Sequence, residues 1–176
     1  MSSLNVVSQQ SSARTEQNGI LMDLVGNVFE NEAKALMRSA PAVTPDIVAA
    51  ALLLAESAGR VIVTGVGKSG HVARKVAATL ASIGKPSYFV HATEASHGDL
   101  GKLSTHDVVV AFSNSGETPE LSDVIQFCQA ASLPLIAVTA GRESALVRYA
   151  AHSIIYPVVE EVCVIGRAPT TSTLVM

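Results

Sequence analysis

The sequence contains no tryptophan, and aromatic residues make up only 4% of its 176 positions. It has 12 basic residues against 15 acidic ones, a formal net charge of −3, and no cluster of lysine or arginine. Proteins that bind nucleic acids or anionic membranes use basic patches, and single-stranded nucleic acids are also held by aromatic stacking. The composition therefore argues against both partners, and any anionic ligand must be held by local groups.

Cysteine is also scarce. Cys128 and Cys163 form no CxxC pair and no metal-site spacing with the histidines, so we expect reduced thiols in a cytoplasmic protein. The opening stretch MSSLNVVSQQSSARTEQNG lacks the pattern of a secretory signal peptide, and we expect residues 1–18 to be disordered. No uninterrupted apolar run reaches the length of a membrane span, which predicts a soluble protein without a membrane partner.

What the sequence does contain is the pattern of an α/β domain over residues 19–176. Apolar residues at helical spacing predict an amphipathic helix over 19–40, and TPD at 44–46 predicts the start of a second helix that stops at Gly59. Beyond it, helical segments alternate with five apolar runs: RVIVTG, PSYFVH, DVVVAFS, LPLIAVTA and HSIIYPV. Such continuous runs are typical of parallel strands covered on both faces. We predict a doubly wound, five-stranded parallel sheet flanked by helices.

In doubly wound sheets, ligands bind in the crevice beyond the carboxyl ends of the strands. The loops at this edge are therefore the candidates for a site: 65–70, 91–102, 113–118, 140–143 and 159–170.

The first of these loops, TGVGKSGH, contains the G-x-G-x-x-G pattern at 65–70. A dinucleotide site also requires an acid at the end of the next strand, but that strand ends in His91. A Walker A loop is excluded because Ile62 stands where its first glycine belongs. A general anion site at a helix N-terminus remains. Lys68 there is either a cation for the ligand or a solvated first-turn lysine.

A second loop, SNSGETPE, follows the run DVVVAF and is rich in hydroxyl groups. TPE at its end reads as a helix cap with a proline at the first helical position, which explains one hydroxyl but not three. Ser113, Ser115 and Thr118 can donate hydrogen bonds to an oxyanion, and Gly116 lets main-chain N–H groups turn inward. Asn114 occupies the serine position of the nucleophile elbow, so these serines are donors rather than nucleophiles.

Two further loops carry titratable side chains. HATEASHGDLG contains His91 and His97, whose spacing matches no standard zinc motif. The simplest interpretation of this segment is a solvated loop. Glu160 and Glu161 follow the last predicted strand and precede a hydroxyl-rich helix start, APTTST. Paired acids are most often only exposed, but at this edge one of them can be a base.

Taken together, GVGKSGHVARKVAATLASIGKPSYFVHATEASHGDLG, SNSGETPE and EEVCVIGRAPTTST resemble the sugar isomerase (SIS) domain of arabinose 5-phosphate isomerases, from about residue 20 to the end. The resemblance implies a cofactor-free enzyme that interconverts D-ribulose 5-phosphate and D-arabinose 5-phosphate through an enediolate. It also implies a cytoplasmic homotetramer that supplies the pathway to Kdo, a lipopolysaccharide sugar.

The resemblance also implies roles for individual residues. Lys68, Glu120 and Glu161 match positions that the family uses in catalysis, and His97 matches a histidine in its substrate site and is a further proton-transfer candidate. His91 matches a position where zinc binds as an inhibitor. The residues implied to contact the substrate are Gly67, Ser69, His91, His97, Ser113, Asn114, Ser115, Gly116 and Thr118.

Two departures from the family accompany these matches. A further catalytic histidine and the paired CBS domains of many members fall beyond Met176, so we expect a truncated form whose last helix is cut short. Two other functions stay open: a non-catalytic phosphosugar-binding regulatory module, and an isomerase of another sugar phosphate. For a carboxylate base near neutral pH, we expect burial to raise its pKa.

Overall fold

Five parallel strands form the centre of the fold, as the sequence predicts. The computed structural model describes residues 3–163, 165 and 168–176. The strands run in the order β2-β1-β3-β4-β5, with all neighbours parallel. Their bounds are Val61–Gly65 (β1), Ser87–His91 (β2), Val108–Phe112 (β3), Leu135–Thr139 (β4) and His152–Ile155 (β5).

The strand order places the reversal of the sheet between β1 and β3. Gly65 at the end of β1 pairs with His91 of β2 on one side and Phe112 of β3 on the other, and Phe112 in turn pairs with Val138 of β4. The loops after β1, β2, β3 and β4 therefore leave the sheet at one edge. Ligand crevices in doubly wound folds lie at such a reversal point.

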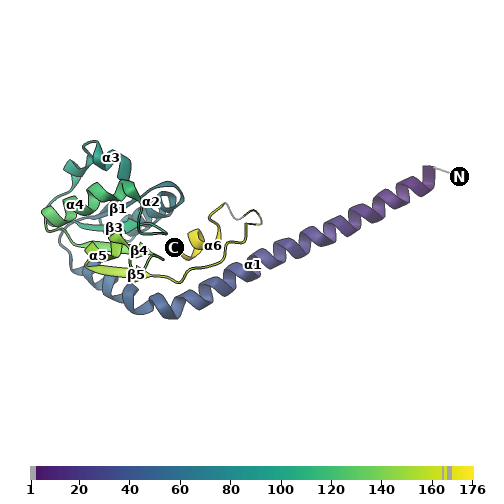
Figure 1. The fold of residues 1–176 in the computed structure, drawn as a ribbon, viewed down its shortest axis with the longest axis horizontal. Helices are drawn as coiled ribbons and strands as arrows, with labels where there is room; N and C mark the ends of the chain where they lie inside the picture. Colours follow the sequence, from purple (N-terminus) through teal and green to yellow (C-terminus); the bar gives the residue numbers. More distant parts are fainter. Residues whose placement is uncertain (1–2, 164, 166–167) are drawn as a thin grey trace.

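Helices cover both faces of the sheet (Figure 1). Alternate side chains of β1 and β3 enter two separate buried clusters, one with Ile62 and Val109 and one with Val63 and Val110. The first cluster is completed by α3, α4 and α5, and the second by α1 and α2. The bounds of the helices are Ser3–Glu56 (α1), Gly67–Ser82 (α2), Ala92–Ser96 (α3), Ser122–Ala130 (α4), Ala145–Tyr149 (α5) and Thr171–Val175 (α6). Two 3₁₀ turns are η1 (Asp99–Lys102) and η2 (Pro119–Leu121).

The N-terminal part differs from the sequence prediction. Residues 3–18, expected to be disordered, and the two helices expected after them form a single helix, α1 (Ser3–Glu56), which includes Pro41 and Pro45. Thr44 does not cap a new helix, because its hydroxyl donates to the carbonyl of Ala40 at 2.6 Å. The helix bends as it reaches the sheet, and its first half projects far from the body (Figure 1). Proline is an ordinary cause of such a bend.

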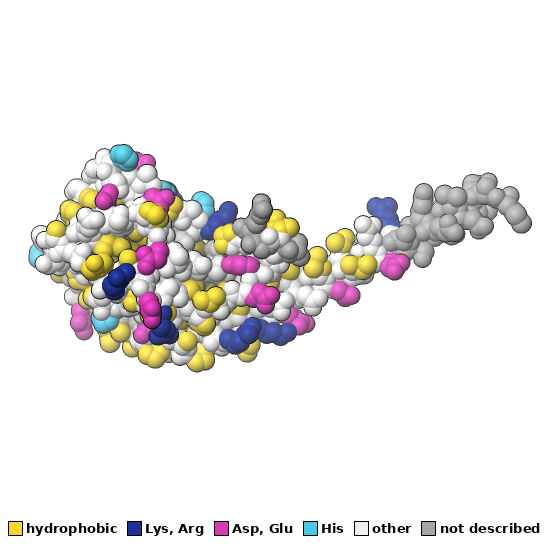
Figure 2. Space-filling view, viewed as in Figure 1, with side chains coloured by type: hydrophobic (Ala, Val, Ile, Leu, Met, Phe, Trp, Pro, Cys, Tyr) yellow, Lys and Arg dark blue, Asp and Glu magenta, His cyan; other side chains and the backbone are white. Residues whose placement is uncertain are grey.

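The projecting half of α1 carries exposed apolar side chains. Met22, Phe29 and Met37 are each more than 70% exposed, and hydrophobic groups appear along this part of the surface (Figure 2). By length and composition alone, the segment Glu16–Glu56 passes the test for a membrane span, which corrects the expectation that no such run exists. Only 11% of the most apolar 18-residue window in that segment is buried, and the described side chains at positions 16–27 of α1 are all exposed.

Gly59 has a different role from the predicted one. The helix ends at Glu56, and Gly59 is not a left-handed stop. A Cβ at this position would lie 2.0 Å from the carbonyl oxygen of His106. The glycine is needed because two stretches of backbone pass in direct contact.

Candidate functional site

The turn between β1 and α2 is built from closely packed glycines. A Cβ on Gly70 would lie 2.9 Å from the carbonyl oxygen of Gly65, so these two positions let the helix start directly against the strand. Gly67 has a φ of +58°, in the left-handed region that favours glycine. Lys68 is exposed in the first turn of α2, and Ser69 beside it is half-buried.

The loop after β3 is closed by its own hydroxyl groups. The hydroxyls of Ser113 and Thr118 lie 2.7 Å apart, and the N–H of Gly116 donates to Ser113 Oγ at 2.9 Å. The N–H of Glu117 donates to Ser115 Oγ at 3.2 Å. Gly116 has a φ of +70°, which allows this tight course. Ser113 is buried, whereas Asn114 and Ser115 are exposed toward the crevice edge.

The predicted helix cap in this loop is partly confirmed. Thr118 precedes η2, and Pro119 stands at the start of the turn as expected. However, the Thr118 side chain makes no capping hydrogen bond, because its hydroxyl faces Ser113 instead. Glu120 lies exposed in the 3₁₀ turn.

Three contacts fix this loop to the residues that follow β4 and β5 and to the start of α5. Asn114 accepts from the N–H of Ala140 at 3.0 Å through its carbonyl, and from the Tyr156 hydroxyl at 2.9 Å through Oδ1. The Glu117 carboxylate accepts from the N–H of Ala145 at 2.8 Å. Tyr156 is 2% exposed, and burial together with the charge of Glu161 raises its pKa, so it stays a neutral donor. The loop is therefore held rigidly before any ligand arrives.

Glu161 is the most heavily hydrogen-bonded carboxylate among the predicted site residues. Its Oε2 accepts from the N–H and hydroxyl of Thr170, at 2.7 and 2.9 Å, and from the N–H of Ser172 at 3.3 Å. Its Oε1 accepts from the Ser172 hydroxyl. Both oxygens are thus engaged by the start of α6.

These contacts reverse the expected titration of Glu161. Burial raises the pKa of the carboxyl, but the hydrogen bonds from Ser172 and Thr170 outweigh it and hold the pKa below its usual value. The expectation of a burial-raised pKa is wrong for this residue. Glu161 is ionised at neutral pH, which is the form that accepts a proton.

A cavity of about 230 Å³ joins these elements. It is lined by the phosphate-loop candidates Asn114 and Ser115, by Glu161 and Ser172, and by Ala140, Gly141, Val158 and Val159. Lys68, Glu120, His91 and His97 do not line it, although they leave the same edge of the sheet. The structure therefore brings one predicted acid and two predicted substrate contacts together at this cavity. Nine other predicted site residues do not line it: Gly67, Lys68, Ser69, His91, His97, Ser113, Gly116, Thr118 and Glu120.

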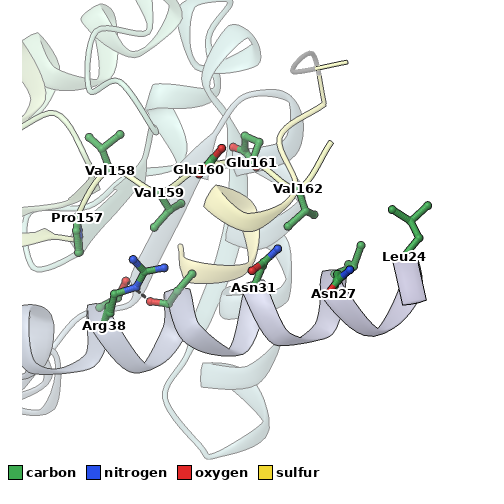
Figure 3. A pocket seen from close by; sticks show the side chains of 13 residues that line it. Leu24, Asn27, Asn31, Arg38, Pro157, Val158, Val159, Glu160, Glu161 and Val162 are labelled. Carbon is green, nitrogen blue, oxygen red and sulfur yellow. Dashed lines mark hydrogen bonds between the residues drawn. The ribbon is translucent and has the colours of Figure 1, made fainter. Parts of the chain in front are cut away.

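A larger cavity of about 470 Å³ lies beside it, between α1 and residues 157–162 (Figure 3). Asn27, Asn31 and Arg38 line it from α1, while Val159 and Val162 point toward the helix from the other side (Figure 3). Glu160 is exposed and reaches this cavity, whereas Glu161 borders both. The two neighbouring acids thus have different surroundings.

The two histidines that were predicted as site residues, His91 and His97, flank the short helix α3. His91 precedes α3 and its Nδ1 accepts from the N–H of Thr93 at 3.2 Å. His97 is exposed at the end of α3. Within the described ranges, no group of three or more histidine, cysteine or acidic side chains is placed to hold a metal ion. Zinc at His91 stays a prediction.

The two cysteines differ in their surroundings. Cys128 is buried in the core, and burial raises the pKa of its thiol to about 12, so the thiol is protonated and unreactive. Cys163 is half-buried.

Sequence reasoning missed several residues that shape the site: Tyr156, Gly141, Thr170 and Ser172. The hydroxyl-rich run APTTST was noted as a helix start, and that signal could have suggested donors for a nearby acid. The link between Asn114 and Tyr156 crosses 42 positions and leaves no local signal.

The comparison with known families decides the wider identity. The model of the SIS domain matches residues 53–176. The chain belongs to the SIS family. This SIS chain is 50% identical over 115 residues to arabinose 5-phosphate isomerase KdsD of Shigella flexneri, covering 65% of this chain and 35% of that protein. It is 48% identical over 130 residues to KdsD of Pseudomonas aeruginosa, covering 74% and 40%.

A solved structure gives the same result for the fold. The Escherichia coli CFT073 protein c3406, determined in complex with arabinose 5-phosphate, superposes with a TM-score of 0.85 at 39% identity, covering 90% of this chain and 84% of that one. This SIS chain spans little more than a third of the length of the curated relatives that it matches.

Proposed function

We propose that this SIS chain carries the isomerase centre that interconverts D-ribulose 5-phosphate and D-arabinose 5-phosphate. The observation that carries the proposal is the cavity in which an ionised Glu161 faces the hydroxyl-rich loop after β3. Its support from relatives is the 48–50% identity to arabinose 5-phosphate isomerases and the arabinose 5-phosphate complex of a protein with a similar fold. A cytoplasmic place in Kdo precursor synthesis belongs to the same proposal.

The phosphate is assigned to the loop 113–118. In the pair formed by Ser113 and Thr118, one hydroxyl donates to the other, and the second proton is left for an anion. Ser115 and Asn114 add exposed polar groups at the cavity. Gly67 and Ser69 lie at the neighbouring turn, where the first N–H groups of α2 favour negative charge.

Proton transfer between C1 and C2 is assigned to Glu161 as the base, because it is ionised and borders the cavity. Lys68 is assigned to the developing enediolate charge, and Glu120 and His97 to proton transfer at the sugar oxygens. The last three lie outside the cavity, so their roles require the sugar to extend from it toward the loops after β1 and β2 and toward η2. The resemblance also assigns an inhibitory zinc contact to His91.

The test compares neighbouring acids. Glu161→Gln is expected to abolish isomerisation, followed by a discontinuous assay of arabinose 5-phosphate, while calorimetry shows nearly unchanged sugar phosphate affinity. Glu160→Gln is the matched control and should retain turnover, because Glu160 is exposed and lies outside the smaller cavity. Lys68→Met gives a second variant on an exposed side chain, with an expected loss of kcat of about 10²-fold. Full turnover by Glu161→Gln would refute the assigned base.

The two alternatives have distinct outcomes. A regulatory SIS module would bind a sugar phosphate without turnover in the complete protein, and an isomerase of another substrate would turn over a hexulose 6-phosphate faster than ribulose 5-phosphate. A panel of pentose and hexose phosphates, assayed for binding and for turnover, separates the three functions. The phosphate loop itself does not distinguish sugar length.

We also propose that the chain forms a homotetramer and that α1 supplies one subunit contact. Eight large apolar residues between positions 20 and 37 are at least 42% exposed. Together they offer on the order of 800 Å², the area that one partner contributes to a standard interface. A bilayer is the less suitable environment, since Asp23, Glu30, Glu32, Lys34 and Arg38 fall on the same stretch.

Sedimentation velocity tests this contact. Phe29→Lys is expected to dissociate the assembly, whereas Glu30→Lys at the next position, where no apolar side chain is lost, should not. Co-sedimentation with lipid vesicles provides the opposing outcome. A monomeric wild-type chain that binds vesicles would overturn the proposed contact.

A further inference from the structure

The carboxylate of Glu161 is oriented by residues that follow it nine to eleven positions later in the chain. Four hydrogen bonds reach it from Thr170 and Ser172, and they include a main-chain N–H and a hydroxyl from each residue. Because the two Oε atoms have different partners, rotation of the carboxylate would break several contacts at once. One orientation is therefore favoured.

The residues that hold Glu161 are themselves fixed. Ser172 is 4% exposed and Thr171 is 1% exposed, and the Thr171 hydroxyl accepts from the N–H of Val162 at 3.3 Å. Val175 and Met176, at the other end of α6, pack against the core cluster shared by α1 and α2. The donors are thus anchored to the body of the domain, and so is the carboxylate.

This arrangement lies at the cavity itself. Glu161 and Ser172 both line the 230 Å³ space together with Asn114 and Ser115. A ligand held by the β3 loop therefore meets a carboxylate whose direction is set by α6. A misplacement of about 1 Å in a reacting group can cost on the order of 10²-fold in rate.

We propose that Thr170 and Ser172 are positioning residues for the isomerisation, acting through Glu161 by fixing its carboxylate at the cavity. The inference rests on the proposed proton-transfer role of Glu161. Neither side chain is assigned a contact with the sugar. Their part is to hold the base in one orientation throughout the reaction.

The electrostatics of the site agree with this geometry. Loss of the Ser172 hydroxyl removes a hydrogen bond that lowers the pKa of Glu161, so the pKa of Glu161 rises in Ser172→Ala. Among the described residues, Tyr156, which stays neutral, interacts with the charge of Glu161, and Glu160 and Arg38 border the larger cavity with it. None of these is altered by the substitution.

The experiment is a carbon-13 NMR titration of the Glu161 carboxyl in the 176-residue chain, with the pH profile of isomerisation measured in parallel. In Ser172→Ala we expect an upward shift of the Glu161 titration, a matching upward shift of the acid limb, and a tenfold or greater loss of kcat. KM should change less than twofold, because the phosphate is assigned to the loop 113–118 and Ser172 is assigned no contact with the sugar. Ser172→Thr keeps the hydroxyl and should restore the wild-type titration.

The matched control is Thr173→Ala, in the same helix, whose hydroxyl donates to the carbonyl of Pro169 at 3.2 Å and not to Glu161. It should leave both titration and rate unchanged. Thr170→Val, which retains the main-chain donor, gives a second variant with a smaller upward shift should Ser172→Ala fail to fold. An unshifted Glu161 titration in both variants, or an equal shift in Thr173→Ala, overturns the inference.

The failure of the proposed function and the failure of the positioning role give different experimental results. If the wild-type chain shows no turnover of any sugar phosphate, the proposed function fails, and positioning for isomerisation fails with it, even where the titration shifts as expected. If turnover is normal but Ser172→Ala and Thr170→Val leave it unchanged, only the positioning role fails.

Discussion

Gly141 offers a sharp test of whether the loop after β3 is the ligand cradle. A Cβ added to Gly141 would lie 2.0 Å from the carbonyl oxygen of Ser115 and 2.8 Å from its carbonyl carbon. Both atoms belong to the backbone of the 113–118 loop, so no side-chain rotation relieves the overlap. Normal contact distances then require that loop to move by roughly 1 Å or more.

The expected cost has two parts. Overpacking of this kind destabilises by about 1–3 kcal/mol, which corresponds to a fall in Tm of roughly 3–10 °C for a chain of this size. Displacement of the cradle should weaken sugar phosphate binding by about tenfold or more, or about 1.4 kcal/mol. We therefore expect Gly141→Ala to fold at 20 °C but to bind arabinose 5-phosphate poorly.

Isothermal titration calorimetry with arabinose 5-phosphate measures the affinity, and thermal unfolding by circular dichroism measures the stability. Gly101→Ala is the matched control, because a Cβ there meets no atom within 4 Å and its φ lies outside the left-handed region. It should change stability by less than about 0.5 kcal/mol and leave binding unaltered. Wild-type affinity in a folded Gly141→Ala protein would show that the 113–118 loop does not hold the ligand.

Three further predictions concern stability. Asp107→Asn should lower the free energy of unfolding in urea by about 2–4 kcal/mol, because the buried carboxylate accepts from the N–H groups of Arg60 and Ser104 and from the Arg60 side chain; an effect below 1 kcal/mol would contradict this. Burial raises the pKa values of Asp107 and Glu161, but hydrogen bonds outweigh burial and hold them below the ordinary values of 3.8 for Asp107 and 4.5 for Glu161. The stabilisation from both carboxylates is therefore present above pH 4.5 and is lost as the pH falls below 3.8. A Tm that stays constant from pH 5 to 3 would contradict this prediction. Gly26→Ala, inside α1 with open space around its Cβ position, should stabilise by about 0.5–1 kcal/mol, and a lower Tm would indicate that this part of α1 is not helical.

The sheet and its ligand edge were predictable because each strand carries its own signal. An apolar run such as VIVTG is buried throughout, and the parallel register brings the loops after Gly65, His91 and Phe112 to one edge without further information. The SIS resemblance and the fold are both confirmed by the family match and the similar solved structure.

The errors arose where a contact formed in the folded chain overrode a local signal, at short range in one case and at long range in the other. Thr44 and Pro45 form a good helix start, yet α1 runs through them and Thr44 bonds back to Ala40. The pKa of Glu161 depends on Thr170 and Ser172, and no spacing rule predicts hydrogen bonds across that loop. Local patterns gave the donors and acceptors, but only the folded chain pairs them.

The long apolar helix has a practical consequence for anyone handling the protein. An isolated helix gains most of its stability from packing, and the side chains described at positions 16–27 of α1 are all exposed. If copies pair along it, dilution removes that support, and the melting temperature must rise with protein concentration. Melting curves recorded at a single concentration would then describe the assembly rather than the chain.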